Sequence, residues 1–318
     1  MWAGSCAGWS RCDAFVTATA VGALAIILLG WLLRRWGVLK AADGQMLIQV
    51  VIYLTLPALV LRIMVTSDLQ AALILVPIVG FAAHGVLVAV ALGAARLWKR
   101  DRPTTGALIV ASAVGNTGFF GVPLIAASGP HLSLASAVMF DAFCTGVLTW
   151  TSTIWMGGRF GDPTADGAPK AGMWRNLLLP PTWALVVGLG LNFAGVNELP
   201  EIIDRPLAIL GGAVLPLVLI YAGLVIEWDG IRRAWRDVAT VTVIRLVVSP
   251  LVCVLFAWMI GLDGDVLRTV VLMAAMPTAM MSLVIGGWFK LKTDVIAGAI
   301  VATTLLATLV LPVIRALL

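Results

Sequence analysis

A nine-residue run in the middle of a long apolar segment carries residue types that could bind a ligand. The run, Gly115–Pro123, reads GNTGFFGVP. Its three glycines and its proline interrupt helical hydrogen bonding, and each backbone group left unbonded in hydrocarbon costs several kcal/mol. Such a break persists only where protein or a water-filled cavity receives those groups. Many secondary transporters build their substrate site from broken helices at the bilayer midplane, so this run predicts a binding site.

A second interruption, Met276-Pro277-Thr278, lies in another apolar segment near the C-terminus. If both segments fold as pairs of half-helices, two half-helix N-termini meet near the midplane. Each terminus has N–H donors without helical acceptors and a partial charge of roughly +0.5. Helix N-termini bind anions without needing a full cation. The two breaks together therefore predict an anion site.

Polar side chains within the breaks are the candidate substrate contacts. The Asn116 amide can donate to a carboxylate or accept from a protonated acid, and Thr117 and Thr278 add hydroxyl groups. The glycines let the backbone turn and approach a ligand closely, while the prolines remove donors and fix φ. The predicted substrate-binding residues are Gly115, Asn116, Thr117, Gly118, Pro277 and Thr278.

Few ionisable residues lie inside the apolar segments. Asp141 is about 15 Å into its segment and Arg245 about 13 Å into another, at 1.5 Å per residue. Charges at such depth usually face a cavity or a partner. We predict that Asp141 carries a coupling proton and that Arg245 is its ion-pair partner or binds the substrate carboxylate. The alternative is a fixed Asp141–Arg245 pair that only holds the protein together. His84 is expected to be a packing residue.

The composition requires that these residues be positioned by membrane helices. The chain is 61% hydrophobic and 12% charged, with a mean hydropathy of +1.05, whereas soluble domains carry about 25% charged residues. The predicted fold is an all-α polytopic membrane protein with ten transmembrane helices. The ten spans are expected at 14–34, 45–65, 71–97, 104–128, 132–156, 180–197, 205–227, 237–261, 266–289 and 294–316.

Basic residues predict the orientation in the membrane. Most of the 21 Lys and Arg residues follow an odd-numbered span, and the alternate loops carry almost none. By the positive-inside rule both termini are then extracytoplasmic in a cytoplasmic (inner) membrane. The net charge of +5 reflects this topology and gives no reason to invoke nucleic acid. The first span is expected to be retained, because its basic residues follow its apolar run. Whether Cys6 and Cys12 pair stays open.

The chain reads as two related halves. Pro57 and Pro216 each follow a leucine within an apolar segment, and nearly the same separation divides Asn116 from Pro277. Because each half holds five spans, the second half must be inverted relative to the first. The predicted organisation is a first repeat at 14–156, a cytoplasmic linker at 157–179 and an inverted repeat at 180–318. Predicted structural helix breaks are Pro57, Pro123 and Pro216.

The run at Gly115–Pro123, the ten-span count and the Met276-Pro277 break resemble the auxin efflux carrier family, which includes bacterial malonate- and malate-type carriers. The family is similar in fold to bile-acid sodium symporters. The resemblance implies two inverted five-helix repeats, crossed broken helices in spans 4 and 9, a scaffold and a transport domain, elevator-like motion and organic anion substrates. Plant members carry a long loop between spans 5 and 6, whereas Gly157–Leu179 is short.

The predicted function is secondary active transport of small organic anions, carboxylates, coupled to H⁺ or Na⁺ or to neither. The leading alternative is a sodium-coupled symporter of the bile-acid type. A membrane-embedded enzyme or a channel is a further alternative, although the chain carries no recognisable enzyme motif and few pore-lining polar residues. No cofactor or metal is expected. The lipid bilayer is the expected surrounding, and a homodimer is left open because no span carries an unmistakable dimer motif.

Overall fold

The computed structural model describes residues 22, 25–40, 43–66, 75–128, 132–162, 180–224 and 232–317. Cys6, Cys12 and most of the predicted linker lie outside these residues. The described part is almost entirely helical and contains no β-strand. Its one β-type contact is an isolated antiparallel bridge between Gly115 and Thr278. The all-helical fold of a polytopic membrane protein, expected from the sequence, is confirmed for this part of the chain.

Five helical stretches of the described residues are long and apolar enough to cross a membrane. They are Leu75–Leu97, Leu134–Phe160, Glu201–Leu224, Trp235–Met259 and Thr293–Leu317. Two shorter apolar helices span Val51–Thr66 and Thr117–Ala127. Large apolar side chains on the outer surface, such as Phe193, Leu251 and Trp258, are mostly exposed. An apolar outer surface is what lipid contact requires.

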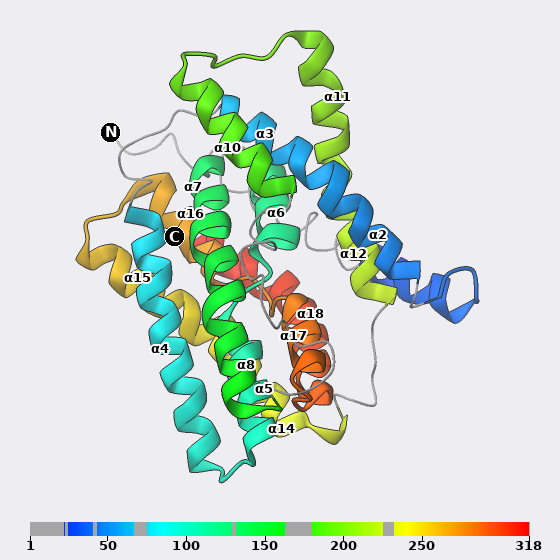
Figure 1. Ribbon diagram of the computed structural model, residues 1–318, viewed down its shortest axis with the longest axis vertical. Coiled ribbons are helices and arrows are strands. Elements are labelled where there is room, and N and C mark those ends of the chain that lie inside the picture. Colours follow the sequence, from blue (N-terminus) through cyan, green and yellow to red (C-terminus); the bar gives the residue numbers. More distant parts are fainter. Residues whose placement is uncertain are drawn as a thin grey trace, which may run out of the picture.

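One group of helices lies at the upper right of Figure 1. It consists of the helical residues 25–35, α2 (Gly44–Val50), η2 (Val51–Thr55), α3 (Leu56–Thr66), α10 (Pro180–Phe193), α11 (Glu201–Gly212) and α12 (Val214–Leu224). α10 lies across α3, and α11 packs on the other side of α3. An ion pair of 2.6 Å between Arg62 and Asp204 ties α3 to α11. We call these helices the first group.

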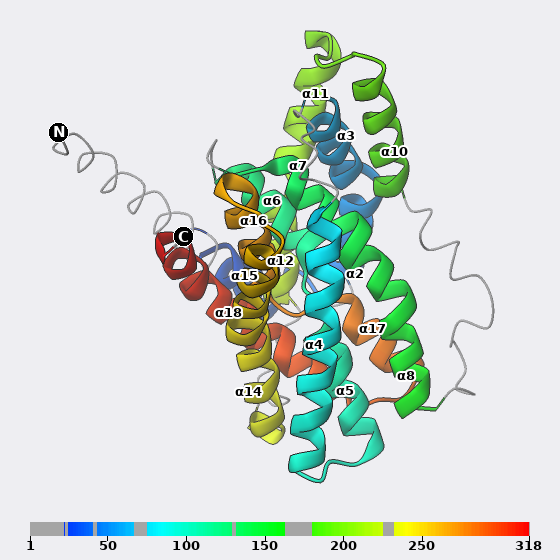
Figure 2. The ribbon, with the colours of Figure 1, turned by 90° about the vertical axis from the view of Figure 1, so that its left-hand side faces the viewer.

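The second group fills the rest of Figures 1 and 2. It consists of α4 (Leu75–Leu97), α5 (Arg102–Ala113), η4 (Thr117–Gly121), α6 (Val122–Ala127), α7 (Leu134–Met139), η5 (Phe140–Gly146), η6 (Thr149–Thr153), α8 (Ile154–Phe160), α14 (Trp235–Val243), η7 (Ile244–Val248), α15 (Ser249–Met259), α16 (Gly264–Ala274), α17 (Met281–Trp288) and α18 (Thr293–Leu317). α4 packs on α5 and α15, and α18 packs on α5 and α14. Helices from both halves of the sequence therefore interleave within each group.

Three of the wide, π-helical turns share a position relative to proline. η2, η4 and η7 end two residues before Pro57, Pro123 and Pro250. A proline has no N–H for the carbonyl four residues earlier, and its ring crowds that carbonyl, so the preceding turn widens. Upstream of Pro216 the interruption is different, because a single non-helical residue, Ala213, separates α11 from α12. Proline thus shapes the spans without ending them.

The two groups meet next to the first break. α12 of the first group contacts both η4 and α6 of the second, and α3 contacts α7. η4 is the start of the half-helix that follows Asn116. The N-terminal end of this half-helix therefore lies at the border between the groups, where a ligand could contact both.

Candidate functional site

The two breaks predicted from the sequence lie against each other. α5 ends at Ala113 and η4 begins at Thr117, while α16 ends at Ala274 and α17 begins at Met281. The non-helical residues between them run antiparallel. The Asn116 N–H donates to the Pro277 carbonyl at 2.7 Å, and the Ala279 N–H donates to the Val114 carbonyl at 3.2 Å. Backbone groups freed by one break thus satisfy those freed by the other.

Two hydroxyl side chains fix the register of the crossing. The Thr278 hydroxyl donates to the Ala111 carbonyl at 3.0 Å, and its N–H donates to the hydroxyl of Thr303 on α18 at 3.0 Å. The Ser282 hydroxyl donates to the Val110 carbonyl at 3.0 Å. Thr278 is completely buried. Because its hydroxyl already donates to a carbonyl in the last turn of α5, Thr278 acts here as a structural contact of the crossing.

Arg245, on η7, gathers the carbonyls at the C-terminal ends of the broken helices. Its Nη2 donates to the Met276 carbonyl at 2.8 Å and to the Ala274 carbonyl at 3.0 Å. The Ser249 hydroxyl donates to the same Ala274 carbonyl at 2.7 Å. Arg245 is only 3% exposed. A guanidinium at helix C-termini is favourable, since the carbonyl ends carry partial negative charge.

The predicted ion pair between Asp141 and Arg245 does not form, although both residues belong to the described part of the chain. The guanidinium faces backbone carbonyls, while Asp141 accepts a 2.6 Å hydrogen bond from the Thr117 hydroxyl. The first break lies between them. A Cβ on Gly115 would collide with Arg245, and a Cβ on Gly118 would lie 2.9 Å from the Asp141 carboxylate. The two charges therefore occupy opposite sides of one glycine-containing backbone segment.

At the crossing, the Asn116 amide and the Ser112 hydroxyl have no hydrogen-bond partner among the described residues. Asn116 is 4% exposed. Its backbone N–H and carbonyl are bonded, but its amide makes no hydrogen bond to any residue that the structure describes. Neither of its amide atoms is among the fully buried polar atoms that lack a partner, so the amide keeps some access to solvent. An accessible amide that is left unbonded at a helix break is a natural contact for a ligand.

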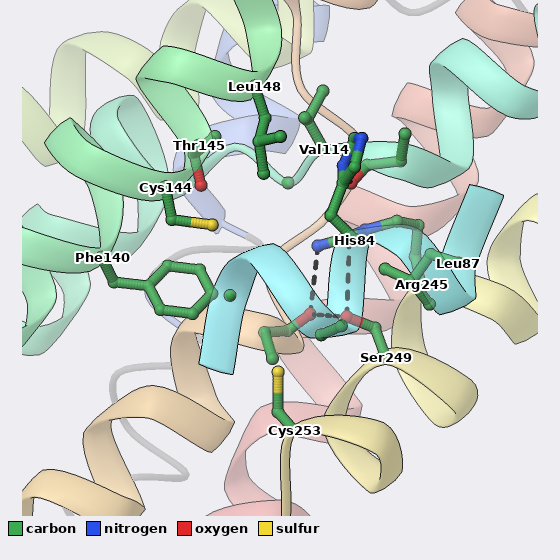
Figure 3. A pocket seen from close by; sticks show the side chains of 15 residues that line it. His84, Leu87, Val114, Phe140, Cys144, Thr145, Leu148, Arg245, Ser249 and Cys253 are labelled. Atoms are coloured by element: carbon green, nitrogen blue, oxygen red, sulfur yellow. Dashed lines mark hydrogen bonds between the residues drawn. The ribbon is translucent and has the colours of Figure 1, made fainter. Parts of the chain in front are cut away.

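A small cavity lies behind the crossing, on the Arg245 side (Figure 3). Its walls include His84, Cys144, Arg245, Ser249 and Cys253, all from the second group. The volume is about 20 Å³, which admits a water molecule but not a carboxylic acid. The cavity is therefore separate from the border where α12 meets η4.

His84 is bonded through both ring nitrogens. Nδ1 lies 3.1 Å from the Ala113 carbonyl and Nε2 lies 2.7 Å from the Ser152 hydroxyl. A carbonyl only accepts, so Nδ1 carries the proton and Nε2 accepts from Ser152. His84 thus caps the last turn of α5, consistent with the packing role expected for it. Sequence reasoning missed Ser249 and Ser152, because a single serine in an apolar span has no distinguishing pattern.

Comparison with known proteins relates nearly the whole chain to transporters. A family model described as membrane transport protein matches residues 15–156 and 169–315. A protein named an uncharacterized transporter from Methanothermobacter thermautotrophicus is 30% identical over 298 residues, covering 93% of this chain and 96% of that protein. A second so named, from Methanocaldococcus jannaschii, is 28% identical over 302 residues, covering 91% and 94%.

Similarity to plant proteins covers a smaller part of the chain. Auxin efflux carrier component 1 of Arabidopsis thaliana is 26% identical over 150 residues, which is 42% of this chain and 23% of the plant protein. The resemblance carried by the Gly115–Pro123 run is thereby confirmed. With its paired helix breaks and a family match along nearly its whole length, the chain belongs to the membrane transport protein family that contains the auxin efflux carriers.

Proposed function

We propose that this transporter is a secondary active carrier of small organic anions, above all carboxylates, and that it binds them at the crossing of the two breaks. The observation that carries the proposal is the Asn116 side-chain amide, which lies beside the start of a half-helix and makes no hydrogen bond to a described residue. The N-terminal N–H groups of η4 have no helical acceptors, and their partial positive charge favours an anion. A carboxylate would satisfy both the amide and these donors.

The substrate would sit on the η4 side of the crossing rather than in the cavity beside Arg245. On the η4 side, Asn116 and Thr117 lie where α12 of the first group contacts the second group. On the other side, the guanidinium is committed to carbonyls and the cavity of about 20 Å³ is too small. Because Asn116 is buried, the groups must separate for substrate to enter. The described conformation is therefore assigned as occluded.

The division into two helix groups supports an elevator-type cycle. The first group would be the scaffold, and the second group, with both breaks, would carry the substrate across the membrane. In this proposal the chain has ten spans as two inverted repeats, 14–156 and 180–318, joined by a linker at 157–179. The interleaving of both halves in each group is what an inverted repeat produces. The protein would reside in the inner membrane with both termini outside.

Proton coupling fits the crossing better than sodium coupling. Sodium needs several oxygen ligands, and the carbonyls of Ala274 and Met276 would be natural ones. Both instead accept hydrogen bonds from Arg245, whose positive charge would repel a second cation. Asp141 is held by one side-chain hydrogen bond, from Thr117, so it is the candidate proton carrier. Uptake into proteoliposomes would follow an imposed pH gradient and would not respond to a sodium gradient.

Substitution of Asn116 tests the site directly. Labelled small carboxylates are first screened by counterflow in proteoliposomes containing the wild-type protein. Asn116→Ala is expected to abolish binding of the substrate so identified, while the purified variant stays monodisperse. The matched control is Asn192→Ala, which removes the same amide from α10, where it donates to the Met64 and Val65 carbonyls. Unchanged affinity in Asn116→Ala would remove Asn116 from the site.

A thiol-labelling experiment tests the proposed orientation. A membrane-impermeant thiol reagent should label Cys6 or Cys12 in reduced, intact spheroplasts, because the proposal places the N-terminus outside. Cys144 and Cys253 are buried and are expected to stay unlabelled. Labelling that appears only after the membrane is opened would contradict the orientation.

A further inference from the structure

A pocket away from the crossing combines arginine and tryptophan side chains. It has a volume of about 530 Å³ and is lined by Trp98, Arg100, Trp235, Arg236 and Ala239. The pocket lies where the C-terminal end of α4 meets the N-terminal end of α14, at the bottom of Figures 1 and 2. Both helices are parts of membrane-crossing stretches, so the pocket lies at the level where a span ends. Its residues have no part in the proposed substrate site.

The backbone on one side of the pocket forms a tight turn. Lys99 has a φ of +50°, and its N–H donates to the Arg96 carbonyl at 3.1 Å. Asp101 then caps α5 by accepting from the Thr104 N–H. This turn places the Arg100 guanidinium 5.8 Å from the centre of the Trp98 ring. The turn thus holds the Arg100 guanidinium beside the Trp98 ring.

The other side of the pocket also places an arginine beside a tryptophan ring. The Arg236 guanidinium lies 5.4 Å from the centre of the Trp235 ring, at the start of α14. The sides are joined by an ion pair, in which Arg100 Nε lies 2.8 Å from Asp237 Oδ1. The N–H is not directed at that oxygen, so the contact is an ion pair without a hydrogen bond. Two stacked Arg–Trp pairs are therefore tethered around one pocket.

The charges of the pocket do not cancel. Asp237 balances Arg100, but Arg236 makes no ion pair with any acidic residue that the structure describes. Arg236 is exposed, as is most of Trp235. A planar guanidinium offers parallel N–H donors that suit phosphate oxygens. A tryptophan at the end of a span sits at the level of lipid headgroups, with its ring against the upper part of the acyl chains.

We infer that this pocket binds the phosphodiester headgroup of an anionic phospholipid in the membrane leaflet that it faces. Arg236 contacts the phosphate, Arg100 stays in its ion pair with Asp237, and the two indole rings pack against the glycerol and the first methylene groups. Basic pockets between membrane helices are suited to such headgroups, and each nearby arginine contributes about fivefold in affinity at roughly 1 kcal/mol. Since α4 and α14 both belong to the second group, the bound lipid is held by that group alone.

Native mass spectrometry of the purified full-length chain tests the inference. The protein in detergent is titrated with phosphatidylglycerol or with phosphatidylcholine that has the same acyl chains. Phosphatidylcholine carries the same phosphate group but has no net charge. Wild type should retain phosphatidylglycerol at least about fivefold more tightly than phosphatidylcholine. Arg236→Gln should lose most of this preference, and Arg236→Lys should keep part of it because the charge remains.

The matched control is Arg232→Gln, which removes one exposed charge close by in the sequence from a residue that does not line the pocket. This variant should bind phosphatidylglycerol like wild type. Equal losses in Arg236→Gln and Arg232→Gln would show only general charge attraction and would overturn the site. Equal retention of both lipids by wild type would overturn it too. Displacement of the lipid by millimolar inorganic phosphate would assign the pocket to free phosphate instead.

Discussion

The two sides of the helix crossing differ in how completely their polar groups are satisfied. On one side, Arg245 and Ser249 bond the carbonyls that the second break exposes, and the adjoining cavity admits little more than a water molecule. On the other side, Asp141 has one side-chain hydrogen bond and the Asn116 amide has none among the described residues. The same short backbone segment forms both sides of the crossing. The difference in hydrogen bonding between the two sides therefore does not follow from burial alone.

This contrast separates structural polar groups from those available to a ligand. Intramembrane charge is often read as a functional site, yet Arg245, the charge most deeply surrounded by acceptors, has its donors committed to holding the break together. The uncharged Asn116 has an accessible amide with unused donors, whereas the other unbonded group, the Ser112 hydroxyl, is completely buried. The hydrogen bonds of the crossing therefore argue against Arg245, the residue that charge alone would select as the ligand contact. The following variants test that division of roles.

Arg245→Ala should have the largest effect. Removing the guanidinium leaves the Ala274 and Met276 carbonyls short of donors, and each buried group left unsatisfied costs about 1–3 kcal/mol. We expect a clear fall in unfolding temperature in detergent or loss of folded protein. Arg268→Ala, which removes an exposed arginine of α16, is the control. An unfolding temperature equal to wild type would mean that Arg245 does not stabilise the crossing.

Asp141→Asn should separate two transport activities. Exchange requires only that the loaded second group moves, whereas accumulation requires a proton to travel with it. The variant should retain substrate exchange and lose accumulation driven by a pH gradient, as measured in proteoliposomes. Accumulation at the wild-type level would exclude Asp141 as the carrier. Loss of both activities together with a lower unfolding temperature would assign it a structural role.

Gly115→Ala and Gly118→Ala form a matched pair on the two sides of the break. The new methyl at Gly115 would collide with Arg245, which is held by several hydrogen bonds, whereas at Gly118 it would crowd the Asp141 carboxylate at 2.9 Å. Overpacking costs typically about 1–3 kcal/mol. We expect Gly115→Ala to lower the unfolding temperature more, and Gly118→Ala to reduce mainly pH-driven accumulation. The reverse order would contradict the contrast.

Thr117→Val should have the smallest effect. It removes the hydroxyl that donates to Asp141 and preserves the shape of the side chain. A hydrogen bond to a charged group contributes about 1.5–3 kcal/mol, but Thr117→Val changes no backbone contact of the crossing. The pH dependence of uptake should shift while maximal exchange stays near wild type. Thr117→Ser, which keeps the hydroxyl, should restore the wild-type profile, and a failure to do so would exclude the hydrogen bond as the cause.

The location of the crossing could be predicted from the sequence better than the hydrogen bonds and ion pairs of its polar side chains. Glycines flank Asn116 inside one apolar segment and Pro277 lies inside another, so the residue pattern indicated where both breaks fall. It did not indicate the partners of Arg245, because backbone carbonyls leave no mark in a sequence. The predicted Asp141–Arg245 pair was wrong for the same reason. Depth along a helix places a residue in the bilayer but does not say on which side of a neighbouring segment it lies.

The wide turns show a second limit. The widened turns before Pro57 and Pro123 follow from the missing proline N–H, and Pro250 shows the same geometry, although we did not single it out from the sequence. η5 and η6 have no proline two residues beyond their ends. Nothing in their residues predicted them; in the structure α4 contacts η5 and α17 contacts η6.

The most direct test of the central claim is an experimental structure of the protein with its transported carboxylate, identified by the counterflow screen. We expect a carboxylate group within hydrogen-bond distance of the Asn116 amide and the first N–H groups of η4, facing α12. Arg245 should keep its bonds to the Ala274 and Met276 carbonyls in that complex. A carboxylate bound to Arg245 in place of those carbonyls, with Asn116 untouched, would contradict the account.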